Sequence, residues 1–288
     1  MPRYKLTIAY DGTEFVGWQK QEPPATEHPG LPVLEHRSED GRERVALRSV
    51  QHIVEQVVRE TVREPVDVVG ASRTDSGVHA RGQVAAFTSR PDPERGVGWP
   101  AERGTDTLVR ALNSRLPRDV LVSKAEIVDD GFNPIGGAVE KEYTYTIVAG
   151  PDRPLWDRSY VFHTWYELDG PRMKAAAAAL VGEHDFAAFA SVNHGRKSTV
   201  RTVFACHVSE QAGDTEKRFV IRVRGNGFLY NMVRIIAGTV MEAGRSSENG
   251  VPRITPEQIA TALANSDRTL AGPTLPPQGL RLEWVRYG

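Results

Sequence analysis

The stretch ASRTDSGVHARGQVAAF, residues 71–87, places a single carboxylate, Asp75, between Arg73 and His79. Gly77 breaks any helical pattern, and apolar, β-rich segments precede and follow the stretch. The pattern therefore predicts a loop that joins two strands. An isolated aspartate in such a loop usually accepts hydrogen bonds from nearby backbone amides and shapes a turn. The residues alone thus favour a structural role for Asp75, and a structural role for His79 as well.

Metal binding is the second interpretation of this loop. Asp75 and His79 have the i, i+4 spacing that suits two ligands on one helix face. A loop does not align them in that way, and no third ligand type follows nearby. Cys206 is the chain's one cysteine, so cysteine clusters and disulfides within the chain are excluded. We expect no metal site.

Outward from the loop, strands and helices alternate in two halves with similar order. In the first half, Ser49 and Thr105 are expected to cap helices, whose apolar residues recur at helical spacing. Strands are predicted at 4–10, 65–71, 82–89, 119–128 and 142–150, then at 200–210, 217–226 and 280–288. Further helices are predicted near Pro171, over 227–245 and from Thr255. Two α/β subdomains follow, residues 1–138 and 139–288.

Composition limits the class of protein without identifying it. The chain has 288 residues, of which 40% are hydrophobic and 25% charged, as in ordinary globular proteins. The net charge is −1, so any basic surface is local. No secretory leader pattern and no membrane-spanning stretch occur, and one cysteine fits a cytoplasmic location. Residues 22–47 are rich in proline and charge and predict an exposed inserted loop.

Several motifs, in one order along nearly the whole chain, resemble the tRNA pseudouridine synthase A family. They are YDGTEFVGWQKQ, GASRTDSGVHARGQVAAF, KEYTYTI, GEHDFAAFAS and GNGFLYNMVRIIAGTVMEAGR. The resemblance implies the pseudouridine synthase fold, an α+β fold with two subdomains that share a mainly antiparallel sheet around a basic cleft. It also implies a homodimer that isomerises tRNA uridines 38, 39 and 40, in the anticodon stem-loop.

The resemblance assigns roles to four residues of this sequence. Asp75 matches the catalytic aspartate, and Arg234 matches the helix arginine that pairs with it. Tyr143 matches the tyrosine that lies against the target base, and Arg73 an arginine associated with base displacement. Spacing alone does not distinguish Tyr143 from Tyr145 on the same strand. It also leaves open whether Arg234 packs inside or faces solvent.

Isomerisation of uridine is consistent with one carboxylate and no cofactor. The N-glycosidic bond breaks and C5 of the same base joins the sugar, so no atom is lost and no net redox change occurs. A carboxylate serves as nucleophile towards the sugar or the base, or as the base that removes a sugar proton. The sequence does not choose among these three routes. Flipping the base out costs a few kcal/mol, and stacking on an aromatic ring offsets part of it.

Local groups of basic residues suggest where RNA would bind. The sequence also departs from the family pattern at two places that bear on RNA contact. Candidate groups are the loop residues Arg196, Lys197 and Arg201, and the strand residues Arg218, Arg222 and Arg224, which equally suit a solvated face. Ile135 stands where the family usually has an arginine. Residues 22–47 are also longer than the usual connection.

Two other classes of function remain open from the sequence. The first is a non-catalytic RNA-binding protein on the same scaffold, against which the presence of Asp75 argues. The second is a glycoside or nucleoside hydrolase, which needs a second carboxyl group near Asp75. The loop supplies none, and Glu140 and Glu142 are the distant candidates.

Overall fold

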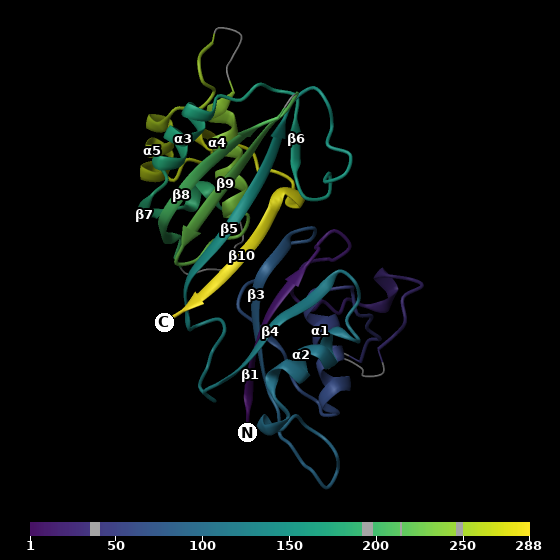
Figure 1. Ribbon diagram of the computed structural model, residues 1–288. Helices are drawn as coiled ribbons and strands as arrows, with labels where there is room; N and C mark the ends of the chain where they lie inside the picture. The colour runs from purple at the N-terminus through teal and green to yellow at the C-terminus, as the bar shows by residue number, and fades with distance from the viewer. Residues whose placement is uncertain (35–40, 192–197, 214, 246–249) are drawn as a thin grey trace. The chain divides into compact units, whose positions relative to one another are not determined.

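The computed structural model describes residues 1–34, 41–191, 198–213, 215–245 and 250–288. The chain divides into two compact units, Met1–Gly137 and Ala138–Gly288, and each is described by itself. Both combine helices with mostly antiparallel strands, which confirms the predicted α+β class (Figure 1). Among the described residues, no helix is long and apolar enough to cross a membrane.

The sheet of the first unit is built around its first strand, whose alternate side chains are buried. This strand pairs antiparallel with a strand on each side, and a two-residue strand adds to one of these. The order is β4 (Val120–Val128), β1 (Arg3–Tyr10), β3 (His79–Thr88) and β2 (Val69–Gly70). β3 begins earlier than predicted, so His79 lies on the strand.

Two helices, α1 (Val50–Val62) and α2 (Thr105–Asn113), complete the first unit. The Ser49 side chain accepts a hydrogen bond from the backbone of His52, which confirms the predicted cap of α1. The predicted cap of α2 is wrong, because Gly104 holds the N-cap position and Thr105 is the first helical residue.

In the described part of residues 22–47, the two ends of the segment lie beside each other and form isolated antiparallel bridges. Isolated bridges join Pro24 to Arg44 and Val33 to Val45, and the Val45 side chain is fully buried. Most of the other described residues are exposed or half-buried, as an inserted loop would be. Residues 35–40 of the predicted loop lie outside the described residues.

The second unit has a longer sheet, and its strands are antiparallel except for a short parallel one at the end of β5. The order is β10 (Leu280–Tyr287), β5 (Ala138–Ala149), β9 (Lys217–Gly225), β8 (Val200–Ala212) and β7 (Gly182–Asp185), with β6 (Phe162–Thr164) beside β5. The strands predicted at 200–210 and 217–226 are confirmed as β8 and β9, and they pair with each other.

Three helices, α3 (Gly170–Ala178), α4 (Met232–Gly244) and α5 (Pro256–Asn265), pack together against this sheet (Figure 1). The predicted helix over 227–245 is shorter at its start, and Phe228 lies outside it. Thr255 forms the expected cap of α5, as part of a capping box with Gln258. Short 3₁₀ turns cover Ala25–Glu27, Ala101–Arg103, Ala187–Phe189, Arg268–Leu270 and Pro277–Gly279.

Candidate active site

The candidate aspartate lies on the loop between β2 and β3. Asp75 is half-buried and Arg73 is exposed. The loop turns back at Gly77, whose φ is +77°. The backbone N–H of Val78 donates to the carbonyl oxygen of Asp75 at 3.1 Å, so the main chain of Asp75 closes the turn. This bond uses the main-chain carbonyl of Asp75 and not its carboxylate.

The segment after β1 is hydrogen-bonded along the Asp75 loop. Trp18 N–H donates to the carbonyl of Thr74 at 3.0 Å, directly before Asp75. Gly77 N–H donates to the carbonyl of Phe15 at 3.3 Å, directly after the turn. The hydroxyl groups of Tyr10 and Thr74 also lie 2.7 Å apart. The chain is therefore held on both sides of Asp75, and the main-chain bonds at Thr74 and Gly77 do not involve the Asp75 side chain.

Two glycines allow this close packing of backbone on backbone. A Cβ atom at Gly12 would lie 2.1 Å from the carbonyl oxygen of Val78. One at Gly17, whose φ is +114°, would lie 2.6 Å from the carbonyl oxygen of Thr74. Real Cβ contacts are essentially never that short. Both positions thus require glycine for the loop to stay where it is.

His79 is buried and serves this packing. Its Nδ1 accepts a hydrogen bond from Gly12 N–H at 2.9 Å, which assigns the proton of the neutral ring to Nε2. Asp11 Oδ1 lies 3.2 Å from the same nitrogen. These contacts fit the structural role that the sequence favoured. Among the described residues, no group of three or more histidine, cysteine, aspartate or glutamate side chains is placed to hold a metal ion.

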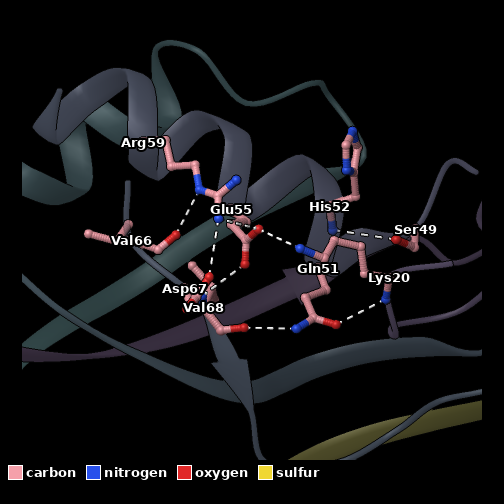
Figure 2. Close-up of polar contacts among 9 residues, drawn as sticks. All are labelled: Lys20, Ser49, Gln51, His52, Glu55, Arg59, Val66, Asp67 and Val68. Carbon is pink, nitrogen blue, oxygen red and sulfur yellow. Dashed lines mark hydrogen bonds and ion pairs between the residues drawn. The ribbon is translucent and has the colours of Figure 1, made fainter. Parts of the chain in front are cut away.

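Two polar side chains of helix α1 hold the segment at Lys20 and the segment directly before β2 (Figure 2). Gln51 accepts from Lys20 N–H at 2.9 Å and donates to the Val68 carbonyl at 2.8 Å. Glu55, only 3% exposed, accepts from Val68 N–H at 3.0 Å and pairs with Lys20 at 2.8 Å and Arg59 at 3.0 Å. Removing one partner of such a buried carboxylate would be strongly destabilising, because it would leave an uncompensated buried charge.

In the second unit, the structure distinguishes the two tyrosines of β5. Tyr145 is fully buried and donates its hydroxyl to the carbonyl of Pro276 at 2.7 Å. Burial raises its pKa, which the positive charge of Arg234 partly opposes. Tyr143 is 6% exposed and meets the Phe228 ring edge-on, with ring centroids 5.3 Å apart. Tyr145 is therefore the structural tyrosine of the pair.

Arg234 lies in the first turn of α4 and is half-buried, so it does not simply face solvent. Its Nε donates to the carbonyl of Leu275 at 2.6 Å, and its Nη1 donates to Oδ1 of Asn231 at 2.7 Å. The segment that contains Pro273 packs directly against α4 at Gly238, which has no side chain. A Cβ atom at Gly238 would lie 1.9 Å from the Pro273 carbonyl oxygen. The space that Gly238 leaves is thus occupied by this segment.

The candidate RNA-binding arginines of β9 have carboxylate partners. Arg218 pairs with Asp157, Arg222 with Glu142 at 2.6 Å, and Arg224 with Glu140 at 3.6 Å. Glu140 and Glu142 are buried beneath them, so these acids are engaged in structural ion pairs. The arginines of this strand face are thus held by ion pairs with neighbouring carboxylates. The predicted loop setting of Arg201 is wrong, because Arg201 lies on β8, where it donates to the carbonyls of Ser198 and Val200. Arg196 and Lys197 lie outside the described residues.

Ile135, at the position of the missing arginine, is 57% exposed on a turn. The Asn133 side chain shapes that turn by accepting from the N–H groups of Ile135 at 2.9 Å and Gly136 at 3.0 Å. Asn133 thus fixes a local turn that offers no cation at this position.

The class of protein follows from comparison with known proteins. A family model described as tRNA pseudouridine synthase matches residues 176–288, within the second unit. Over the full length, tRNA pseudouridine synthase A 2 of Clostridium perfringens is 36% identical across 287 residues, with 100% of both chains covered. The tRNA pseudouridine synthase A of Bacillus subtilis is 37% identical over 287 residues, with 99% of each covered. That of Geobacter sulfurreducens is also 37% identical over 287 residues, with 100% of both covered.

The chain belongs to the tRNA pseudouridine synthase A family. The sequence interpretation found the loop of Asp75 and the helix of Arg234 through their motifs. It missed the groups that hold them, namely Gly12, Gly17 and Asn231. The available signals were the two glycines in YDGTEFVGW and the polar residue directly before MVR.

Proposed function

We propose that this protein isomerises uridine to pseudouridine in the anticodon stem-loop of tRNA, at positions 38, 39 and 40, with Asp75 as the catalytic residue. The full-length similarity to proteins named for this activity supports the proposal. The observation that carries it for this chain is the Asp75 loop, held on both sides by main-chain hydrogen bonds at Thr74 and Gly77. These bonds fix the position of the loop, and with it the main chain that carries Asp75.

The proposed reaction breaks the bond between N1 of uracil and C1′ of the sugar and forms a bond between C5 and C1′. The proton on C5 is lost to solvent, and N1 gains one, so atoms and electrons balance. Asp75 acts on the sugar or the base, as a nucleophile or a proton acceptor. Each of these roles requires the carboxylate to be ionised in a site that excludes water, where desolvation alone would favour the neutral acid.

The other three residues are proposed to hold the substrate and the acid. Arg234 supplies a positive charge that keeps the carboxylate ionised by a charge-assisted hydrogen bond. Tyr143 presents a ring face or edge to the flipped uracil, and Arg73, exposed on the loop, contacts the displaced RNA. We assign Asp75 and Arg73 to a subdomain of residues 1–138, and Tyr143 and Arg234 to one of residues 139–288. The compact units Met1–Gly137 and Ala138–Gly288 support that division.

The test follows the fate of the C5 hydrogen. Unmodified tRNA carrying tritium at uridine C5 is incubated with wild type, with Asp75→Asn and with Asp130→Asn, an exposed acid of the same unit. Wild type and Asp130→Asn are expected to release tritium at equal rates, and Asp75→Asn to release none while still binding tRNA. Release at the wild-type rate by Asp75→Asn would remove its catalytic role.

The same experiment separates the competing classes. Wild-type protein that binds tRNA and releases no tritium would be the non-catalytic RNA-binding protein. Free uracil in the products would indicate hydrolysis. Sequencing of the modified positions in a total tRNA pool then tests positions 38, 39 and 40, where modification elsewhere would contradict the proposed targets.

We also propose that the protein works in the cytoplasm as a homodimer. The single cysteine and the tRNA substrate support the location, and membership of the family supports the dimer. Light scattering coupled to size-exclusion chromatography is expected to give twice the chain mass of 31.8 kDa. A monomer mass at micromolar concentration, with full activity, would contradict the homodimer.

A further inference from the structure

Asn231 has an unusual backbone for its place in the fold. In the described part of the chain, three non-glycine residues have positive φ: Arg63, Asn231 and Ser266. Arg63 and Ser266 follow the last turns of α1 and α5, where a left-handed residue commonly ends a helix. Asn231 instead precedes α4, with φ 62° and ψ 2°, where an extended residue is the rule. Backbone of this kind persists only where the surrounding structure holds it.

The Asn231 side chain does not perform the usual task of its position either. An asparagine at an N-cap typically accepts a hydrogen bond from a backbone N–H of the first turn. No such bond is made here. Its Oδ1 accepts from Nη1 of Arg234 at 2.7 Å, and its Nδ2 donates to Oγ of Ser191 at 2.8 Å. The left-handed backbone thus turns the amide towards Arg234.

The amide is itself fixed at its far end. Ser191 N–H donates to the carbonyl of Tyr230 at 3.1 Å, so the serine is tied to the residue before Asn231. On another side of the guanidinium, the Leu275 carbonyl accepts from Nε of Arg234 at 2.6 Å. A planar guanidinium held at both Nη1 and Nε has a fixed plane as well as a fixed position.

We propose that Asn231 is a positioning residue that sets the orientation of the Arg234 guanidinium for the reaction. The inference rests on the proposed role of Arg234 as the partner of the catalytic carboxylate. Asn231 and the Leu275 carbonyl are neutral acceptors, so they orient the guanidinium without cancelling its charge. An aspartate at position 231 would orient it as well, but would compete with the catalytic carboxylate for it.

This difference between amide and carboxylate gives the test its direction. In Asn231→Asp, the bond to Arg234 becomes charge-assisted, and a negative charge is added at the start of α4. Both changes favour the folded state, whereas the loss of the donor to Ser191 opposes it. Thermal stability is therefore expected to stay near the wild-type value or rise. The kcat for tritium release is expected to fall by about tenfold or more, with little change in KM.

A second variant removes the interaction and keeps the backbone. Asn231→Gly suits a positive φ and deletes both side-chain bonds, so kcat is again expected to fall about tenfold while the protein stays folded. Asn265→Asp is the matched control, because it makes the same chemical change at an exposed position of α5. It is expected to keep wild-type kcat.

The outcomes separate this inference from the proposed function. Wild-type kcat in both Asn231→Asp and Asn231→Gly, with Arg234→Ala inactive, would overturn the positioning role and leave the role of Arg234 intact. Full activity in Arg234→Ala would remove the role of Arg234 itself. A loss of kcat that merely follows a loss of folded protein, measured by circular dichroism, would make Asn231 structural and would also overturn the inference.

Discussion

Gly12→Ala tests whether the close approach of two loops positions Asp75, the proposed catalytic residue. The added Cβ would lie 2.1 Å from the carbonyl oxygen and 2.5 Å from the carbonyl carbon of Val78. Ordinary contact begins at 3.4 Å, so the two atoms would have to separate by more than 1 Å, and the obstacle is backbone that cannot rotate away. Val78 donates its N–H to the Asp75 carbonyl at 3.1 Å, so a shift of Val78 is passed directly to Asp75.

A displacement of about 1 Å at a reacting group costs on the order of a hundredfold in rate, equivalent to about 2.7 kcal/mol in the barrier. We therefore expect kcat for tritium release from tRNA to fall about a hundredfold in Gly12→Ala. KM is expected to change little, because Gly12 is buried and the substitution leaves the exposed surface unaltered.

Gly131→Ala provides the control for this experiment. Gly131 belongs to the same unit, has no positive φ, and a Cβ there meets nothing within 4 Å. Its kcat is expected to match wild type. A Gly12→Ala protein that is folded by circular dichroism and keeps wild-type kcat would show that the packing does not place Asp75.

Three further predictions concern individual side chains. Burial raises the pKa of the Cys206 thiol to about 12, so a thiol-reactive dye is expected to label unfolded but not native protein, and rapid native labelling would contradict this. Burial lowers the pKa of His52 below that of the unfolded chain, so this residue contributes stability at neutral pH that is lost as pH falls through about 6.5. Urea unfolding of His52→Gln should show a slightly flatter fall in stability towards acid than wild type, and identical slopes would refute the assignment. Thr255→Ala removes the capping box of α5 and should cost about 1 kcal/mol in unfolding free energy, whereas Thr255→Ser should cost much less.

Local signals predicted the parts of the fold that local interactions decide. Ser49 and Thr255 are correctly placed caps, because each side chain bonds to backbone three residues further on. Thr105 is wrong because Gly104, with φ +79°, already provides the entry into the helix. The early start of β3 at His79 depends on pairing with β1 and on Gly12, which lies far away in sequence. The local sequence of a glycine-containing loop does not predict pairing with residues that are distant along the chain.

For the candidate site too, the sequence predicts what continuous motifs contain, but not what depends on contacts between distant residues. The motif around Asp75 is continuous in sequence and is recognisable there, as is the helix that carries Arg234. The two tyrosines, Tyr143 and Tyr145, differ in contacts with residues far away in sequence, namely Phe228 for Tyr143 and Pro276 for Tyr145. No strand pattern could separate them, because both side chains point to the same face of β5.

The partners of the arginines separate structural from functional candidates more sharply than their spacing. Arg222 of β9 lies against the buried carboxylate of Glu142, and pairing of that kind neutralises both charges within the fold. Arg234 is oriented instead by a neutral amide and a neutral carbonyl, at Asn231 and Leu275. The Asp75 loop is likewise held through main-chain groups. In the proposed reaction, the carboxylate that reacts and the cation that supports it must both keep their charges. A second carboxylate close to Asp75 would compete for the same arginine, and the loop of small and basic residues around Asp75 contains none.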